Sequence, residues 1–329
     1  MIFLFLVKGF DINMSNKRIL TDKIFEYFVM IVALTAVVSI FLIFIFIVKE
    51  ALPIFYDEEI RYDNGNEIAT MPKLFFPQII DGQLDYRWLP TSHNPKYGIP
   101  ILIVGSIKVT FIAILFAAPL AISAAIYSSQ FAGKIFKEII KPTIELLAGI
   151  PSVVLGFFAL IVLAGFVEKY LGVKPGLNTF TAGIALGIAV IPIIFTITDD
   201  SLSSVPKSYI EASLALGANK NQTIWKVLLP AVSPGIFAGV VLGFGRAIGE
   251  TMIVLMAVGD SDILSANLFD PAKTMPATIA AEMGEIATGG THYTVLFFIG
   301  FMLFTFTFIL NYIGDLVVNR FKKKLAGLR

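Results

Sequence analysis

Six long runs of apolar residues constrain this chain more than any other feature of its sequence. A bilayer core of about 30 Å requires about 20 apolar residues per helix, and each run is long enough. The composition agrees, because 57% of the 329 residues are hydrophobic and only 15% are charged. We therefore predict an all-α polytopic membrane protein. The predicted spans are about 24–48, 99–129, 144–167, 179–198, 232–258 and 293–317.

The connections between these runs predict the orientation of the chain. Most lysines and arginines lie in one alternate set of connections, and the other set carries more acid. Because cytoplasmic loops carry an excess of basic residues, we predict a cytoplasmic (inner) membrane protein with both termini inside. The predicted domains are a cytoplasmic segment 1–23, a first span 24–48, an external segment 49–98, a core 99–317 and a basic tail 318–329. Residues 1–10 lack the basic start and the cleavage site of a signal peptide. Because Met14 opens a more usual cytoplasmic start, we interpret residues 1–13 as an upstream start-site artefact or a disordered extension.

Several classes of function are disfavoured by what the sequence lacks. The net charge of +1 is not the excess of positive charge that is typical of a nucleic-acid-binding protein. The absence of cysteine rules out disulfides and thiolate chemistry. His93 and His292 are far apart in polar stretches, so we expect surface residues and no metal site. The chain contains no G-x-x-x-x-G-K-[ST] motif, and we expect it to bind no nucleotide or other cofactor itself.

The cytoplasmic connection 199–231 carries the most specific motif. It contains Glu211-Ala212-Ser213, then Gly217, then "VLLP" ending at Pro230. This spacing resembles the EAA loop of ABC importer permeases, with Ser213 in place of the second alanine. We predict two short helices that turn at Gly217, the second ending at Pro230. The resemblance implies that this loop couples the chain to a separate subunit that hydrolyses ATP.

Arg246 is unusual because it interrupts the apolar run "VLGFGRAIGETMIVLM" at 241–256. A central arginine costs about 2.5–3.5 kcal/mol on membrane-insertion scales. Glu250 follows four residues later, so both side chains are predicted on one helix face, where they can pair. One interpretation is a structural ion pair between helices. The other is an anion path, because arginine presents a planar fork of donors to an oxyanion.

Longer motifs carry a second resemblance, over nearly the whole chain from about Lys17. "GRAIGETM", "DILSANLFDPAKTMPATIAAEMGE", "IELLAGIPSVVLGFF" and the "WLP" at Trp88 resemble the phosphate-specific ABC importer permeases, in their PstC-type rather than PstA-type form. The resemblance implies a six-helix type I (MetI-like) permease fold in the lipid membrane. It also implies a PstA-type second permease, a PstB-type ATPase dimer, an external PstS-type phosphate-binding protein, and inorganic phosphate as substrate. Carried over by motif, Arg246, Glu250 and Thr251 are the translocation residues.

Lys108 leaves two interpretations open. It lies near the predicted outer end of the second span, so its ammonium group can snorkel to the interface. Alternatively it is a cation at the outer mouth of the anion path.

Two alternative functions also remain at the level of sequence. One is an ABC permease for another oxyanion, such as molybdate or sulfate. The other is an ion-coupled secondary carrier, which often shows internal repeats and matched intramembrane acids. Neither feature is visible here, and a carrier would leave the EAA loop unexplained.

Overall fold

The computed structural model describes residues 16–63, 66–80, 83–262 and 264–325. The chain divides into two compact units, residues 1–49 and residues 50–329, which are described separately below. The predicted extension 1–13 lies outside the described residues.

The described part of the first unit is one helix, α2 (Asn16–Ala51), whose last two residues belong to the second unit. At 1.5 Å per residue a helix of this length reaches about 54 Å, more than a bilayer core requires. Two hydroxyls in its apolar part are satisfied within the helix: Thr35 donates to the carbonyl of Ile31 at 2.8 Å, and Ser39 donates to the carbonyl of Thr35 at 2.8 Å. These two polar groups can therefore lie in lipid without a partner from another helix.

Six helical segments of the described chain are long and apolar enough to cross a membrane, which confirms the predicted number. They are Asp22–Tyr56, Ile99–Phe131, Ser152–Leu171, Thr179–Ser203, Lys220–Ile248 and Thr291–Arg320.

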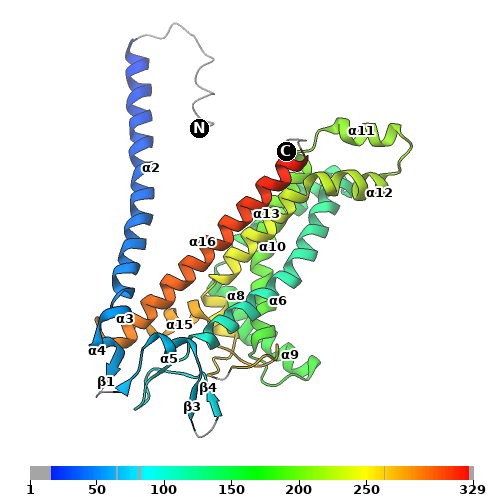
Figure 1. The fold of residues 1–329 in the computed structure, drawn as a ribbon. Coiled ribbons are helices and arrows are strands. Elements are labelled where there is room, and N and C mark those ends of the chain that lie inside the picture. The colour runs from blue at the N-terminus through cyan, green and yellow to red at the C-terminus, as the bar shows by residue number, and fades with distance from the viewer. Residues whose placement is uncertain (1–15, 64–65, 81–82, 263, 326–329) are drawn as a thin grey trace. The chain divides into compact units, whose positions relative to one another are not determined.

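The second unit is built around four long helices that run side by side (Figure 1): α6, α10, α13 and α16. Their packing depends on small residues. A Cβ atom at Gly183 of α10 would lie 2.5 Å from the side chain of Ile112 on α6, so only glycine permits this approach. The bounds of these helices are Ile99–Ile126 (α6), Thr179–Ser203 (α10), Leu229–Ile248 (α13) and Thr291–Leu325 (α16).

The remaining helices of the second unit are short. Two of them, α8 and α12, continue into π-helical turns at Ala159–Leu163 and Ile224–Leu228, and the long helix α6 continues into another at Tyr127–Phe131. The short helices are α3 (Pro53–Tyr56), α4 (Glu58–Arg61), α5 (Met71–Phe75), α7 (Lys134–Ala148), α8 (Ser152–Phe158), α9 (Ala164–Leu171), α11 (Lys207–Ala215), α12 (Lys220–Thr223), α14 (Met252–Ala257) and α15 (Met275–Glu282).

The predicted third span, 144–167, is displaced in the structure. Proline disfavours helical geometry in the residue before it, so α7 ends at Ala148 and α8 starts after Pro151. The membrane-crossing segment is therefore Ser152–Leu171, and α7 is a separate amphipathic helix.

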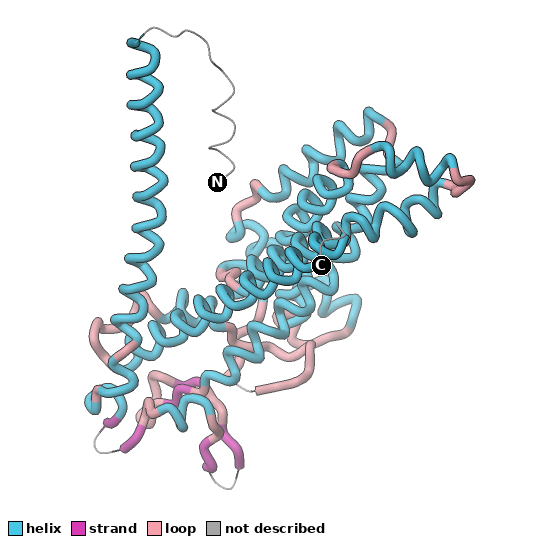
Figure 2. The backbone as a smooth tube through the Cα atoms, turned by 45° about the horizontal axis from the view of Figure 1, so that its top comes forward, coloured by secondary structure: helices cyan, strands magenta, loops and turns pink. Residues whose placement is uncertain are grey.

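The segment 49–98, predicted to be external, departs from the all-α prediction. In its described part it contains three antiparallel two-stranded hairpins, which gather at the end of the second unit where α6 begins (Figure 2). Tyr62 pairs with Glu67, Ile79 with Leu84, and Trp88 with Tyr97. The strands are β1 (Tyr62–Asp63), β2 (Asn66–Glu67), β3 (Gln78–Ile80), β4 (Gln83–Asp85), β5 (Trp88–Leu89) and β6 (Lys96–Tyr97).

The third hairpin is anchored to the helical core by Trp88. Its indole donates to the Glu282 carboxylate at 3.0 Å, and its ring packs edge-on against Tyr97. His292 Nε2 lies 3.2 Å from the same carboxylate, and its side chain is only 16% exposed. The prediction of a surface residue is therefore wrong for His292, because the hairpin folds over it. His93 is exposed, as predicted.

Candidate translocation and coupling sites

The helix that carries Arg246 is broken directly after it. Helix α13 ends at Ile248, and α14 begins at Met252. Glu250 and Thr251 lie in the break, and the peptide N–H of Glu250 bonds to the carbonyl of Ala247 at 3.2 Å. The predicted fifth span, 232–258, is therefore two helices rather than one, and the helical segment that is long and apolar enough to cross a membrane is Lys220–Ile248.

The break also corrects the predicted pairing of Arg246 with Glu250. The two residues do not share a continuous helix face, because Glu250 follows the end of α13. Within the described chain no ion pair joins their side chains. The guanidinium is thus not neutralised by the partner that the sequence spacing suggests.

Arg246 lies on an exposed stripe of α13. Leu242 and Gly249 share this stripe, whereas Gly243 and Ala247 face inward and are buried. The inward face packs on α10, α6 and α16. An arginine exposed on an apolar helix would be costly against lipid. The stripe is therefore suited to a second protein surface or to a water-filled path.

Glu250 lines a narrow crevice between α6, the break and the start of α15. Its side chain is half-buried. Thr251 does not line this crevice, and its hydroxyl donates weakly to the carbonyl of Gly249 at 3.4 Å. The residues of the crevice are Ser106, Val109, Thr110, Ala247, Ile248, Glu250, Val254, Thr274 and Pro276.

Lys108 holds a loop in place instead of reaching an interface. The residue is only 9% exposed, so the snorkelling interpretation is wrong. Its ammonium group donates to the carbonyls of Ser265 and Asn267, at 3.0 and 2.6 Å. A cation whose donors bind two backbone carbonyls stabilises the segment between α14 and α15, and no sequence pattern indicated this contact.

In its described residues, 259–262 and 264–274, that segment is a loop with its own polar network. Ser265 donates to one carboxylate oxygen of Asp270 at 2.5 Å, and Asn267 donates to the other at 2.9 Å. Lys273 lies 3.0 Å from Asp260 and 3.3 Å from Asp262. Burial lowers the pKa of Lys273, but the hydrogen bonds and charges of the two aspartates outweigh it and raise the pKa above its ordinary value. These contacts give the loop a defined conformation beside the crevice that Glu250 lines.

A second buried ionic contact lies at the opposite end of α10. Lys141 of α7 bonds to Asp200 at 3.0 Å and to Asp199 at 3.4 Å, and Asp199 is only 1% exposed. The hydrogen bond to Asp200 is the largest of the effects that raise the pKa of Lys141. No sequence pattern indicated this contact, because the partners are more than fifty residues apart.

The EAA-like loop forms the predicted helical hairpin at the end of the second unit opposite the β-hairpins (Figure 1). Helix α11 is followed by Gly217, whose φ of +82° is the left-handed conformation that glycine tolerates best. This confirms the turn predicted there. Asn219 then caps α12, and its side chain and backbone form reciprocal bonds with Gln222, both at 2.9 Å.

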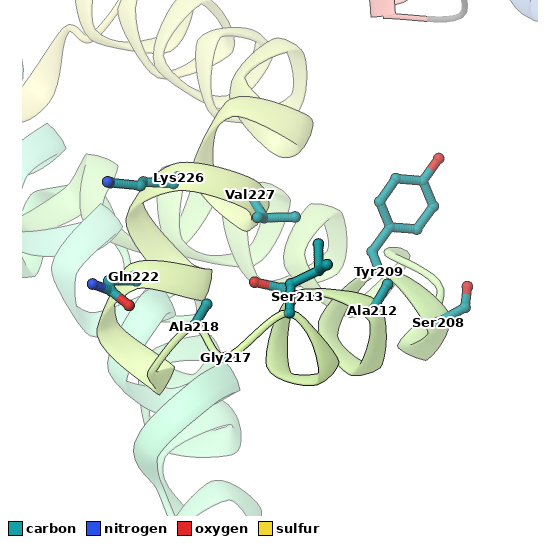
Figure 3. Close-up of a pocket in the computed structure, with 10 residues that line it drawn as sticks. Ser208, Tyr209, Ala212, Ser213, Gly217, Ala218, Gln222, Lys226 and Val227 are labelled. Carbon is teal, nitrogen blue, oxygen red and sulfur yellow. The ribbon is translucent and has the colours of Figure 1, made fainter.

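Ser213 gives the hairpin a bond that the alanine of the family pattern could not make. Its hydroxyl lies 3.0 Å from the hydroxyl of Thr223 on α12, and both residues are buried. Glu211 and Ala212 face outward on the same helix. Figure 3 shows the groove between the two arms, with Tyr209 and Ser208 at one end and Lys226 and Gln222 at the other. Its volume is about 700 Å³.

Pro230 does not end the second arm, contrary to the sequence prediction. The π-helical turn at Ile224–Leu228 leads directly into α13, where Pro230 lies in the first turn. A proline is tolerated there because the first N–H groups of a helix need no intrahelical partner. The coupling hairpin and the helix of Arg246 are consequently one continuous rod, Lys220–Ile248.

Comparison with known proteins agrees with these features. A probable ABC transporter permease protein YqgH of Bacillus subtilis is 40% identical, over 68% of this chain and 72% of the relative. The phosphate transport system permease protein PstC of Xylella fastidiosa (strain Temecula1) is 34% identical, over 72% of this chain and 78% of the relative. The PstC protein of Pasteurella multocida is 30% identical, over 72% of this chain and 79% of the relative.

A solved structure and a sequence family complete the comparison. An inward-facing crystal form of the MetNI methionine ABC transporter is 19% identical with a TM-score of 0.53, over 68% of this chain and 97% of that chain. This likeness concerns the fold, and it confirms the predicted MetI-like permease architecture. Residues 117–323 match the family described as binding-protein-dependent transport system inner membrane component. Because the match covers more than half of a multi-pass chain with a coupling hairpin, the protein belongs to this family of transporter membrane subunits.

Proposed function

We propose that the chain is a permease subunit of an ATP-driven importer of inorganic phosphate. The assignment of the substrate rests on Arg246, which is an exposed cation inside an apolar run. Its expected partner, Glu250, lies beyond the end of the helix. The names of the PstC relatives support phosphate in particular. With a PstA-type second permease, the exposed stripe of α13 forms the path across the cytoplasmic membrane.

The energy for transport comes from a PstB-type ATPase dimer that docks on the coupling hairpin. The hairpin exposes large apolar side chains, among them Leu216 at 89% and Trp225 at 70%. Such residues are costly to leave in water and are typical of a docking surface. Because Lys220–Ile248 is one helical rod, a movement at the hairpin is transmitted directly to Arg246. The chain itself binds no cofactor in this proposal, and an external PstS-type protein delivers phosphate.

The substrate is tested by uptake into vesicles that hold the complete complex, with the loaded binding protein added outside. We expect uptake of phosphate, strong competition by arsenate, and little competition by sulfate or molybdate. Arsenate competes because it has the same charge and proton count as phosphate at neutral pH. Inhibition by sulfate or molybdate without inhibition by arsenate would assign the chain to another oxyanion.

Both termini and the coupling hairpin are cytoplasmic in this proposal. The chain has no cysteine, so single substitutions report on topology without background. His93→Cys, next to the third hairpin, should react with an impermeant thiol reagent on intact spheroplasts, and Asn221→Cys on α12 should react only after permeabilisation. Both positions are exposed in the structure, so protection reflects the membrane and not burial. The opposite labelling pattern would reverse the orientation.

A further inference from the structure

One buried threonine hydroxyl beside Glu250 lacks a hydrogen-bond partner within the part of the chain that the structure describes. It is the Oγ1 of Thr274, which is 1% exposed, and Thr110 is a second buried threonine, also 1% exposed. Both line the crevice that Glu250 lines. An unsatisfied buried hydroxyl is destabilising. Its presence therefore indicates a state in which a ligand satisfies it.

The Thr274 side chain also does not cap the helix that follows it. It is the N-cap residue of α15, where a threonine side chain normally accepts a bond from the first turn. It makes no such bond here. Instead the hydroxyl of Ser106 on α6 accepts the N–H of Met275 at 2.9 Å. The capping function is supplied from another helix, which leaves the Thr274 hydroxyl available.

The groups around the crevice select one kind of ligand. The two hydroxyls can donate to anionic oxygens, and the positive end of the α15 dipole points to the same place. The Glu250 carboxylate can only accept. A ligand that satisfies all three must carry both anionic oxygens and an acidic proton. Inorganic phosphate keeps at least one proton at neutral pH, whereas sulfate keeps none.

The crevice is too narrow in this conformation to admit a water molecule. Its walls are not one rigid body, however. Glu250 lies in the non-helical break between α13 and α14, and Thr274 is the last residue of the loop that leads into α15. Entry of a ligand requires these two elements to move apart. The unsatisfied Thr274 hydroxyl favours that opening, because it gains a partner in the open state.

We propose that Thr110, Thr274 and Glu250 form a second anion station on the path, separate from Arg246. In it the two hydroxyls donate to phosphate oxygens and the carboxylate accepts the phosphate proton. The station rests on the proposed function, because it requires that phosphate passes the break in the fifth span. It adds a reason for selectivity that the guanidinium alone does not provide.

The test compares Thr274→Val, Thr274→Ser and the control Thr278→Val in the complete complex with loaded binding protein. Thr278 is buried one turn further along α15 and does not line the crevice. We expect Thr274→Val to lower the maximal uptake rate about tenfold, the loss that accompanies one hydrogen bond to a charged group. The serine variant and the Thr278 variant should retain most of the rate.

Assembly and thermal stability separate this role from a structural one. Valine has nearly the shape of threonine, and the lost hydroxyl has no partner, so Thr274→Val should assemble and melt like the wild type or slightly higher. In the double variant Thr274→Val with Glu250→Gln, the fold-reduction of the maximal uptake rate should be smaller than the product of the fold-reductions in the two single variants. The effects are not independent, because both groups bind one anion.

Three results would overturn the station. They are normal uptake by Thr274→Val, poor assembly of that variant, or multiplicative losses in the double variant. If the wild-type complex takes up no phosphate, the proposed function itself fails, and the two failures are thereby distinguished.

Discussion

Replacement of Arg246 by glutamine is expected to abolish phosphate uptake, by about a hundredfold or more, while the subunit still assembles with its partners. Loss of one preorganised donor to a developing or moving anion typically has an effect of this size. Assembly should persist, because Arg246 is exposed and makes no ion pair with Glu250 in the described chain. Uptake by the reconstituted complex and co-purification of the partner subunits are the measurements.

Arg246→Lys provides the finer comparison. It retains the charge but loses the planar fork of donors, so we expect an impaired complex rather than a normal or an inactive one. Arg61→Gln, in the external segment, is the matched control and should leave uptake unchanged.

The exchange Arg246→Glu with Glu250→Arg distinguishes transport from a structural pair. A structural pair would survive reversal, and function would return. In the structure the exchange moves the cation out of α13 into the break, so we expect no recovery. Near wild-type uptake in the exchanged complex would show that the arginine serves only to hold helices together.

Gly217→Val is expected to uncouple ATP hydrolysis from uptake and to weaken co-purification of the ATPase. The φ of +82° at Gly217 is strained for a β-branched residue by about 1–3 kcal/mol, so the turn between α11 and α12 should shift. Membrane insertion should survive, because the turn lies between the spans. Gly133→Val is the control: its φ is −65° and an added Cβ meets open space, so uptake should stay normal.

Glu211→Lys tests the same hairpin through charge rather than backbone. Glu211 is exposed on α11 and makes no ion pair within the described residues, so its reversal should not unfold the hairpin. We expect loss of ATPase association with normal amounts of the subunit in the membrane. Normal association and normal uptake in both Gly217→Val and Glu211→Lys would refute a docking role for this loop.

The broken fifth span shows where local sequence rules reach their limit. Spacing of four residues placed Arg246 and Glu250 on one helix, and nothing in the run "GFGRAIGET" requires a stop at Ile248. The stop is decided by α6 and α15, which pack around the break and receive Glu250 in their crevice. Pro230 is the converse case. Local rules predict that a helix ends there, but the π-helical turn at Ile224–Leu228 leads directly into α13, and Pro230 lies in the first turn of α13.

By itself the sequence determined the properties that depend on local chemistry. Apolar runs of about 20 residues can be stable only across a bilayer, so the number of spans was predictable. The turn at Gly217 and the motifs of the coupling loop could likewise be recognised in the sequence. Only the tertiary structure decided which distant groups meet: Lys108 with the carbonyls of Ser265 and Asn267, Trp88 and His292 with Glu282, and Thr274 with Glu250 across one crevice. These contacts depend on how helices far apart in the chain pack, and packing of that kind leaves no periodic signal in a single sequence.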